Sequence, residues 1–408
     1  MESEIETTDL LAGTSITFVV DYYSEWTGLK WNIDQFADQL MSEGCFVTIL
    51  CFDGDSQTEF VDGGKTIRQS KHPGFFPPVA THLNYKVYRE MNRIEDSTDL
   101  FHIFNTNCSA GAGIYKQFGG NTPVLSTLNN WGIVCPSYKL EQGNPYTNHS
   151  FWERIKCSYD AARNQLEKIL SIPYSQYFLL EKKWPSKNLD QYAVLSEYVA
   201  EVFRANGFPN RIQVVGNHLD HSFIENANRI NSSDKKDEQL QILYVGRLIE
   251  SKGLNLLLDA LDESNRNDIE IKLAGEGRLK NKIENRSYTE CLGFVDRDEL
   301  PALYKRSDLF VHPATRPEPF GKTILEALHC DTPVLCSDIG APPEIAGNAC
   351  LTFESGSVDS LQSQIEYLAN NPDKLFEIRS HCTEEREKYS FKTTYLKTKQ
   401  IYTELLGI

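Results

Sequence analysis

A regular alternation of short apolar segments with amphipathic helical stretches limits most strongly what this chain can fold into. Residues 16–20 and 46–52 are apolar runs of the β type, and between them apolar side chains recur three and four positions apart, the spacing of one helix face. The alternation restarts at residue 241 and continues to residue 335. Strands that alternate with helices predict parallel sheets covered by helices on both faces, and so an α/β fold.

A polar segment between the two runs divides the chain. A length of 408 residues suits two domains. We expect a first doubly wound, Rossmann-like domain in residues 1–222, a linker over 223–238, a second such domain over 239–385, and a last helix in 386–408. Ligands of these sheets bind beyond the carboxyl ends of the strands, so a site is expected in a cleft between the domains.

Charge and composition exclude several classes of partner. The net charge of −16 argues against binding nucleic acid, which requires a basic surface. Ten cysteines without a C-x-x-C pair, an acidic N-terminus unlike a secretory signal, and no apolar run near the ~20 residues of a membrane span predict a cytoplasmic protein. The basic cluster at residues 181–187 leaves two alternatives open, a solvated loop and a weak peripheral contact with a membrane.

Two carboxylates near the C-terminal end give the first indication of chemistry. Glu318 lies in a Pro/Gly loop, and Glu326 lies eight positions later, just inside an apolar helical run. The unsatisfied N–H groups at the start of that helix would attract an anion. A phosphate-bearing ligand between two carboxylates that accept from hydroxyls indicates a nucleotide sugar. Taken alone, two surface acids around a helix start would explain the pattern better.

Two basic residues strengthen that interpretation. Arg247 follows a predicted strand, and Lys252 lies where the next helix begins. A bidentate arginine and a point-charge lysine above one sheet edge suit a diphosphate. Alone they could be surface residues of a turn, but their position ahead of Glu318 favours the diphosphate.

In order and spacing these segments resemble the retaining glycosyltransferases of family 4, which have the GT-B fold and a Glu-x7-Glu motif. The resemblance covers about residues 230–355 and departs from the family at 340–344, where two glycines are common. It implies two Rossmann-like domains facing across a cleft, with the acceptor on the N-terminal and the donor on the C-terminal domain. It also implies that the last helix crosses back to the N-terminal domain. Further segments that match the family are residues 273–278, 292–295, 307–313 and 332–335.

The resemblance also implies roles for particular residues. Glu318, Arg247 and Lys252 would be catalytic, Glu326 would accept from ribose hydroxyls, and the diphosphate would leave without a metal ion. No cofactor is expected beyond the nucleotide-diphosphate sugar itself. The donor pocket would comprise Arg247, Lys252, Phe294, Val295, Glu318, Phe320, Gly321, Lys322, Thr323 and Glu326.

The N-terminal half matches the family more loosely. Gly28 lies where relatives commonly have paired glycines, and Asn129 lies where many have a histidine that contacts the donor sugar. His102, near another strand end, is either part of this acceptor and sugar side or a hydrogen-bonded core histidine. With these residues the resemblance implies transfer of a sugar to a glycan, lipid or small-molecule acceptor.

Other functions stay open as alternatives. A nucleotide-sugar epimerase or a phosphorylase-like enzyme could use the same fold, and a non-catalytic sugar-nucleotide-binding protein could use the same pocket. The acidic pairs Asp53/Asp55 and Asp296/Asp298 are interpreted as bystanders rather than metal ligands, with Asp298 as a helix N-cap. The glycines at 111–113 lack the third glycine of a dinucleotide loop.

Overall fold

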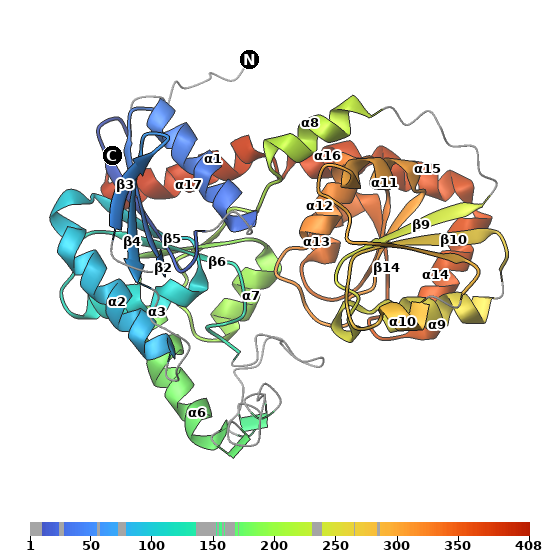
Figure 1. Ribbon diagram of the computed structural model, residues 1–408, viewed down its shortest axis with the longest axis horizontal. Helices are drawn as coiled ribbons and strands as arrows, with labels where there is room; N and C mark the ends of the chain where they lie inside the picture. Colours follow the sequence, from blue (N-terminus) through green and yellow to red (C-terminus); the bar gives the residue numbers. More distant parts are fainter. Residues whose placement is uncertain are drawn as a thin grey trace.

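The computed structural model contains two α/β domains, each built on its own sheet (Figure 1). The residues that it describes are 10–23, 28–54, 58–71, 79–135, 152, 155–156, 159, 168–169, 171–230, 239–264, 266–283 and 286–408.

The N-terminal sheet has eight strands, in the spatial order β3-β4-β2-β1-β5-β6-β7-β8. All neighbouring strands are parallel except β3 and β4, which form an antiparallel hairpin at the edge. The sequence did not indicate this hairpin. Every residue of β3 is exposed, so the strand lacks the apolar alternation of a half-buried strand. The strand bounds are β1 Ser15–Val20, β2 Phe46–Gly54, β3 Thr58–Asp62, β4 Lys65–Lys71, β5 Leu100–Ile103, β6 Val124–Leu128, β7 Gln191–Val194 and β8 Ile212–Val214.

The C-terminal sheet has six parallel strands in the order β11-β10-β9-β12-β13-β14. This is the Rossmann order, in which the strand sequence reverses between the first and fourth strands, here β9 and β12. The N-terminal sheet reverses in the same way between β1 and β5. The bounds are β9 Leu240–Val245, β10 Ile269–Ala274, β11 Thr289–Gly293, β12 Leu309–His312, β13 Val334–Ser337 and β14 Cys350–Phe353.

Helices cover both faces of each sheet. In the N-terminal domain α1 Gly28–Ser42 packs on one face, and α2 Val79–Ile94, α3 Thr106–Gln117 and α7 Glu197–Ala205 pack on the other. The α6 helix, Ser171–Phe178, extends away from this body (Figure 1). The C-terminal helices are α8 His221–Arg229, α9 Leu254–Ser264, α10 Lys280–Ile283, α11 Leu300–Arg306, α12 Lys322–His329, α13 Pro342–Ala346, α14 Val358–Asn370, α15 Pro372–Ser380 and α16 Cys382–Glu387.

The last helix, α17 Phe391–Leu406, returns to the N-terminal domain and lies beside α1 (Figure 1). Its Tyr395, Ile401 and Tyr402 are buried in the N-terminal core. Lys399 Nζ also lies 2.6 Å from a carboxylate oxygen of Glu43, which follows α1. The two ends of the chain therefore share one core.

Most of the described part of the expected linker is helical. Helix α8 begins after Asp220, whose carboxylate accepts from the N–H of Phe223 at 3.0 Å. Phe223 and Ala227 are buried against the C-terminal core, and two such positions in a polar segment were too few to indicate a helix from the sequence. The rest of the expected linker, residues 231–238, lies outside the described residues.

The basic cluster at residues 181–187 is not a solvated loop. It forms a π-helical turn, Leu179–Lys183, followed by a short 3₁₀ turn, Pro185–Lys187. Lys183 is buried and donates to Asn206 Oδ1 at 3.0 Å. Within the described ranges, no helix is both long and apolar enough to cross a membrane.

Candidate active site

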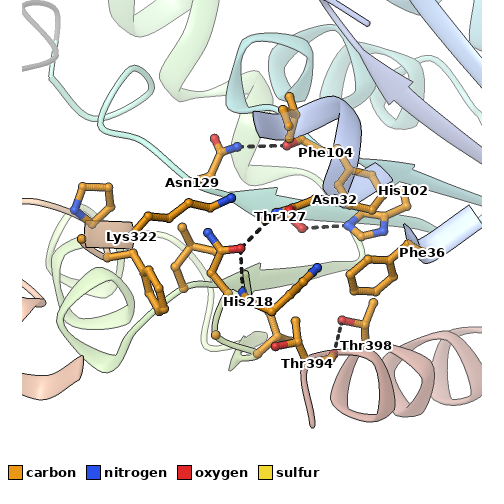
Figure 2. A pocket seen from close by; sticks show the side chains of 18 of the residues that line it. Asn32, Phe36, His102, Phe104, Thr127, Asn129, His218, Lys322, Thr394 and Thr398 are labelled. Carbon is orange, nitrogen blue, oxygen red and sulfur yellow. Dashed lines mark hydrogen bonds between the residues drawn. The ribbon is translucent and has the colours of Figure 1, made fainter. Parts of the chain in front are cut away.

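A cavity of about 370 Å³ lies between the domains (Figure 2). Its N-terminal wall comes from α1, β5 and β6, its back from residues 215–218 and α17, and its C-terminal wall from residues 318–322. It is therefore placed at the strand ends of the N-terminal sheet and at the start of α12. The cavity brings together six of the predicted residues, His102, Asn129, Glu318, Phe320, Gly321 and Lys322.

The Glu318 carboxylate meets two basic groups. Lys252 Nζ donates to it, and His312 Nε2 lies 3.5 Å from the same oxygen. Burial by itself would raise the pKa of Glu318, but His312 and Lys252 outweigh burial and hold this pKa well below its usual value. Glu318 is therefore a charged hydrogen-bond acceptor at the cavity wall.

The loop that carries Glu318 is fixed at three consecutive carbonyls, those of residues 317–319. Two of their three donors belong to the N-terminal domain. In chain order the carbonyls accept from Trp131 Nε1 at 3.2 Å, from the Ala341 N–H at 3.0 Å and from Ser196 Oγ at 3.0 Å. The orientation of this loop consequently depends on both domains.

A second contact between the domains involves the start of α7. The Glu344 carboxylate accepts from the N–H groups of Glu197 at 2.8 Å and Tyr198 at 3.1 Å. Negative charge at a helix N-terminus is stabilising, because the N–H groups there lack partners within the helix. Glu344 therefore caps a helix of the opposite domain.

The two predicted basic residues lie in different surroundings. Lys252 ends a 3₁₀ turn before α9 and is paired with Glu318. Arg247 is exposed just after β9, and its carbonyl accepts from Tyr244 Oη at 2.9 Å. Both follow β9 at the point where the strand order of the C-terminal sheet reverses, where ligands of such sheets bind.

Glu326 is placed away from the cavity. Its carboxylate is buried, accepts from Tyr304 Oη at 3.0 Å and lies 3.5 Å from Arg297 Nη1. Burial raises the pKa of Glu326. We expected the Glu326 carboxylate to accept from ribose hydroxyls, but in the structure it contacts protein groups.

The other predicted residues are spread around the C-terminal edge and the start of α1. Phe294 is exposed after β11, Val295 is half-buried, and Thr323 is half-buried in the first turn of α12. Gly28 begins α1, and its neighbour Leu29 lines the cavity. The structure does not bring Phe294, Val295 or Thr323 to the cavity wall.

His102 and Asn129 lie on the N-terminal wall, with their polar atoms partly engaged (Figure 2). His102 Nδ1 lies 2.6 Å from Tyr402 Oη and its Nε2 lies 2.7 Å from Thr127 Oγ1, so both ring nitrogens have protein partners. This is the hydrogen bonding of a core histidine, and it orients the Thr127 hydroxyl. Asn129 Nδ2 donates to the Phe104 carbonyl at 3.0 Å.

We expect the free energy of unfolding to fall as pH decreases from about 6.5, because two buried histidines stay neutral in the folded protein. Burial lowers the pKa of His102 and of His218 to about 3. The unfolded chain binds a proton at each of these positions below about pH 6.5, so stability is present above this pH and is lost toward pH 3. Each histidine contributes up to about 1.4 kcal/mol per pH unit.

Chemical unfolding at several values between about pH 7 and about pH 5, where most carboxylates stay charged, tests this expectation. In the His102→Gln variant the amide can still hydrogen-bond but cannot titrate, so the dependence on pH should become shallower. An identical pH dependence in both proteins would contradict the assignment.

Several residues of the site were missed in the sequence. His218 lines the cavity and Trp131 binds the loop of Glu318, yet neither was predicted as a site residue. Arg297 ion-pairs with Asp220, and its guanidinium carbon lies 5.1 Å from the centre of the Trp31 ring. Neither spacing nor composition marks these side chains, because they meet only after the domains assemble.

One member of each acidic pair has a structural partner. Asp298 accepts from Asn226 Nδ2 at 3.0 Å, and the N-cap of α11 is Glu299 without a side-chain bond, so the predicted N-cap role of Asp298 is wrong. Asp53 accepts from the Tyr23 N–H at 2.7 Å, and Asp55 lies outside the described residues. In the described part of the chain, no three His, Cys, Asp or Glu side chains are grouped to hold a metal ion.

Comparisons of sequence place the chain near known glycosyltransferases. Residues 225–389 match the family of glycosyl transferases group 1. An uncharacterized glycosyltransferase of Methanocaldococcus jannaschii is 27% identical over 358 residues, which cover 82% of this chain and 97% of the relative. The O-antigen chain mannosyltransferase B of Escherichia coli is 31% identical over 134 residues, which cover 30% of this chain and 35% of that protein.

Comparisons of structure confirm the predicted fold. Sucrose-phosphate synthase from Thermosynechococcus elongatus superposes with a TM-score of 0.71 at 16% identity, covering 97% of this chain and 99% of that one. Anabaena HepE in complex with UDP and glucose superposes with a TM-score of 0.62 at 16% identity, covering 95% and 99%. Both are GT-B glycosyltransferases, so the prediction of two doubly wound domains in the GT-B arrangement is confirmed, whereas membership of family 4 stays a prediction.

Proposed function

We propose that this relative of the group 1 glycosyltransferases transfers a sugar from a nucleoside-diphosphate sugar to an acceptor. We further propose that it does so with retention of anomeric configuration, as a member of family 4, and without a metal ion or other cofactor. The observation that carries the proposal is the cavity between the domains, in which the charged Glu318 meets the start of α12 and polar groups of the N-terminal sheet.

The basic residues after β9 support a diphosphate leaving group. Lys252 is within hydrogen-bonding reach of Glu318, so a donor sugar held by Glu318 would place its phosphates beside the lysine. Arg247 is exposed nearby in sequence and free to turn toward a ligand. The two positive charges would stabilise the negative charge that develops as the diphosphate departs, which is the role a metal ion has in other transferases.

The groups around Glu318 support binding of the sugar. Its ionised carboxylate can accept from two sugar hydroxyls, and the N–H groups that begin α12 can donate to sugar or phosphate oxygens. On the opposite wall Asn129 offers an amide that both donates and accepts. The acceptor would enter from the N-terminal side, so that its hydroxyl approaches the face from which the diphosphate departs.

Incubation with a panel of nucleotide sugars tests the proposal. A bound donor should raise the thermal midpoint, since a ligand at about 100 times its Kd adds about 2.7 kcal/mol. With acceptor present, nucleoside diphosphate and a product of unchanged anomeric configuration should form, and both should still form in excess EDTA. Conversion of a donor without any acceptor would indicate an epimerase, and binding without turnover would indicate a sugar-nucleotide-binding protein.

A further inference from the structure

The back of the cavity carries buried polar groups that have no hydrogen-bond partner in the described part of the chain. His218 lies between β8 and α8 with 2% of its surface exposed, and neither ring nitrogen makes a hydrogen bond with the residues that the structure describes. Thr394 on α17 is also buried, and its hydroxyl makes none. Buried polar groups are almost always hydrogen-bonded, because leaving one unpaired costs its full desolvation. Two such groups facing one cavity therefore indicate a polar ligand.

A positive charge points into the same cavity. Lys322 begins α12 and extends its ammonium group between the two domains, toward the wall that carries Thr127 and Asn129 (Figure 2). It forms neither an ion pair nor a hydrogen bond with the described residues. Burial lowers the pKa of Lys322 to about 8, and the nearby Arg297 adds to this effect. The lysine is still mostly protonated at neutral pH.

The charge balance of the cavity favours an anionic ligand. Glu318 is the acidic residue of the lining, and it is already paired with Lys252. Lys322 is thus the charged group of the lining that pairs directly with none of the described residues, although the charges of Glu326 and Asp220 also act on it and raise its pKa. The remaining groups, His218 and Thr394, can each donate a hydrogen bond to an oxygen. One lysine with two neutral donors is a suitable set for a phosphate or carboxylate group.

We propose that Lys322, His218 and Thr394 bind the oxyanion of an anionic sugar substrate. This proposal rests on the proposed function and narrows its substrate class. The shared chemistry is a phosphate or carboxylate on a sugar, and two sources can supply it, a phosphorylated or carboxylated acceptor and a uronic acid donor. The N-terminal domain and α17 form most of the cavity, so the acceptor is the source that the lining favours. A cavity of about 370 Å³ is also small, at the lower end of sites for small molecules.

Binding of inorganic phosphate in the presence of saturating UDP or GDP tests the subsite. The nucleotide occupies the proposed diphosphate position, so calorimetry reports the additional site. We expect Lys322→Met and His218→Leu each to weaken phosphate binding, the former by about 10-fold or more, and Lys322→Arg to retain most of it. Lys280→Met removes an exposed lysine of the same domain and should leave binding unchanged. Equal phosphate affinity in wild type and Lys322→Met would overturn the proposal.

Matched sugars then identify the source. Hexose 6-phosphates and hexuronates are compared with the neutral hexoses, and UDP-glucuronate with UDP-glucose, in wild type and Lys322→Met. A preference for the anionic sugar that disappears in the variant supports the subsite. A preference among the free sugars identifies the acceptor as the source of the anion, and a preference for UDP-glucuronate identifies the donor. No preference in either comparison overturns the subsite. Because these are equilibrium measurements, an anion preference without turnover would refute the proposed transferase activity and leave the subsite standing.

Discussion

Replacing Lys252 with methionine is expected to lower kcat/KM for the sugar nucleotide by about 10- to 100-fold. Lys252 is the direct partner of Glu318 and lies where a diphosphate would need a positive charge. Methionine keeps the length and apolar stem of the side chain but removes its charge. Of the described residues, the variant leaves the Glu318 carboxylate with His312, at 3.5 Å, as its remaining basic partner. Steady-state kinetics with a donor and acceptor identified from the panel measure the loss.

Controls separate this effect from a general effect of charge or folding. Lys252→Arg keeps the charge and should retain more activity than methionine, and Lys280→Met should behave as wild type because Lys280 is exposed and outside the site. Unchanged thermal unfolding would show that the variant is folded. Wild-type kinetics in a folded Lys252→Met protein would remove Lys252 from the reaction.

Replacing Gly253 with alanine is expected to destabilise the C-terminal domain by more than about 2 kcal/mol. Gly253 has φ +74°, and a Cβ atom there would lie 1.6 Å from the carbonyl oxygen of Pro313. The obstacle is backbone, so it cannot move aside as a flexible side chain would. Relief requires separating the turn that carries Lys252 from the segment after β12, and activity should therefore fall together with stability.

Gly293→Ala is the matched control for Gly253→Ala. Gly293 lies in the same domain at φ +69°, but nothing lies within 4 Å of a Cβ atom built there. Both substitutions have the left-handed backbone in common, which costs alanine about 1–2 kcal/mol. Only Gly253→Ala adds the collision. Scanning calorimetry of the two variants measures the difference, and equal midpoints would mean that the close approach of Gly253 to Pro313 has no energetic weight.

The sequence predicted the fold because its alternation of strand and helix is local. The buried strands and the apolar face of α1, with Ile33, Phe36 and Leu40, follow directly from spacing. The β3–β4 hairpin was missed because its polar, exposed residues give no apolar period, and α8 because only Phe223 and Ala227 mark its buried face.

The site was predicted less completely, because its geometry depends on contacts between distant segments. Strand ends and helix starts place Glu318 and Lys252 near one another whatever their side chains contact. Three features arise only when residues 215–218, α12 and α17 meet. They are the unpaired ring of His218, the enclosure of Glu326 by Tyr304 and Arg297, and the direction of Lys322. The sequence pattern does not predict which polar atoms lack a hydrogen-bond partner in the folded protein.

The three hydrogen-bonded carbonyls of residues 317–319 couple the separation of the two domains to the position of Glu318. Two of their donors, Trp131 and Ser196, lie on the N-terminal domain. Any motion that separates the domains would break both bonds and leave the loop with its contacts inside the C-terminal domain, those to the Ala341 N–H and the Lys252 ammonium. How firmly the Glu318 carboxylate is held would then depend on the angle between the domains. In the proposed transferase, an open molecule with a loosened Glu318 would be poorly prepared to cleave its donor, so domain opening would protect the sugar nucleotide from wasteful hydrolysis.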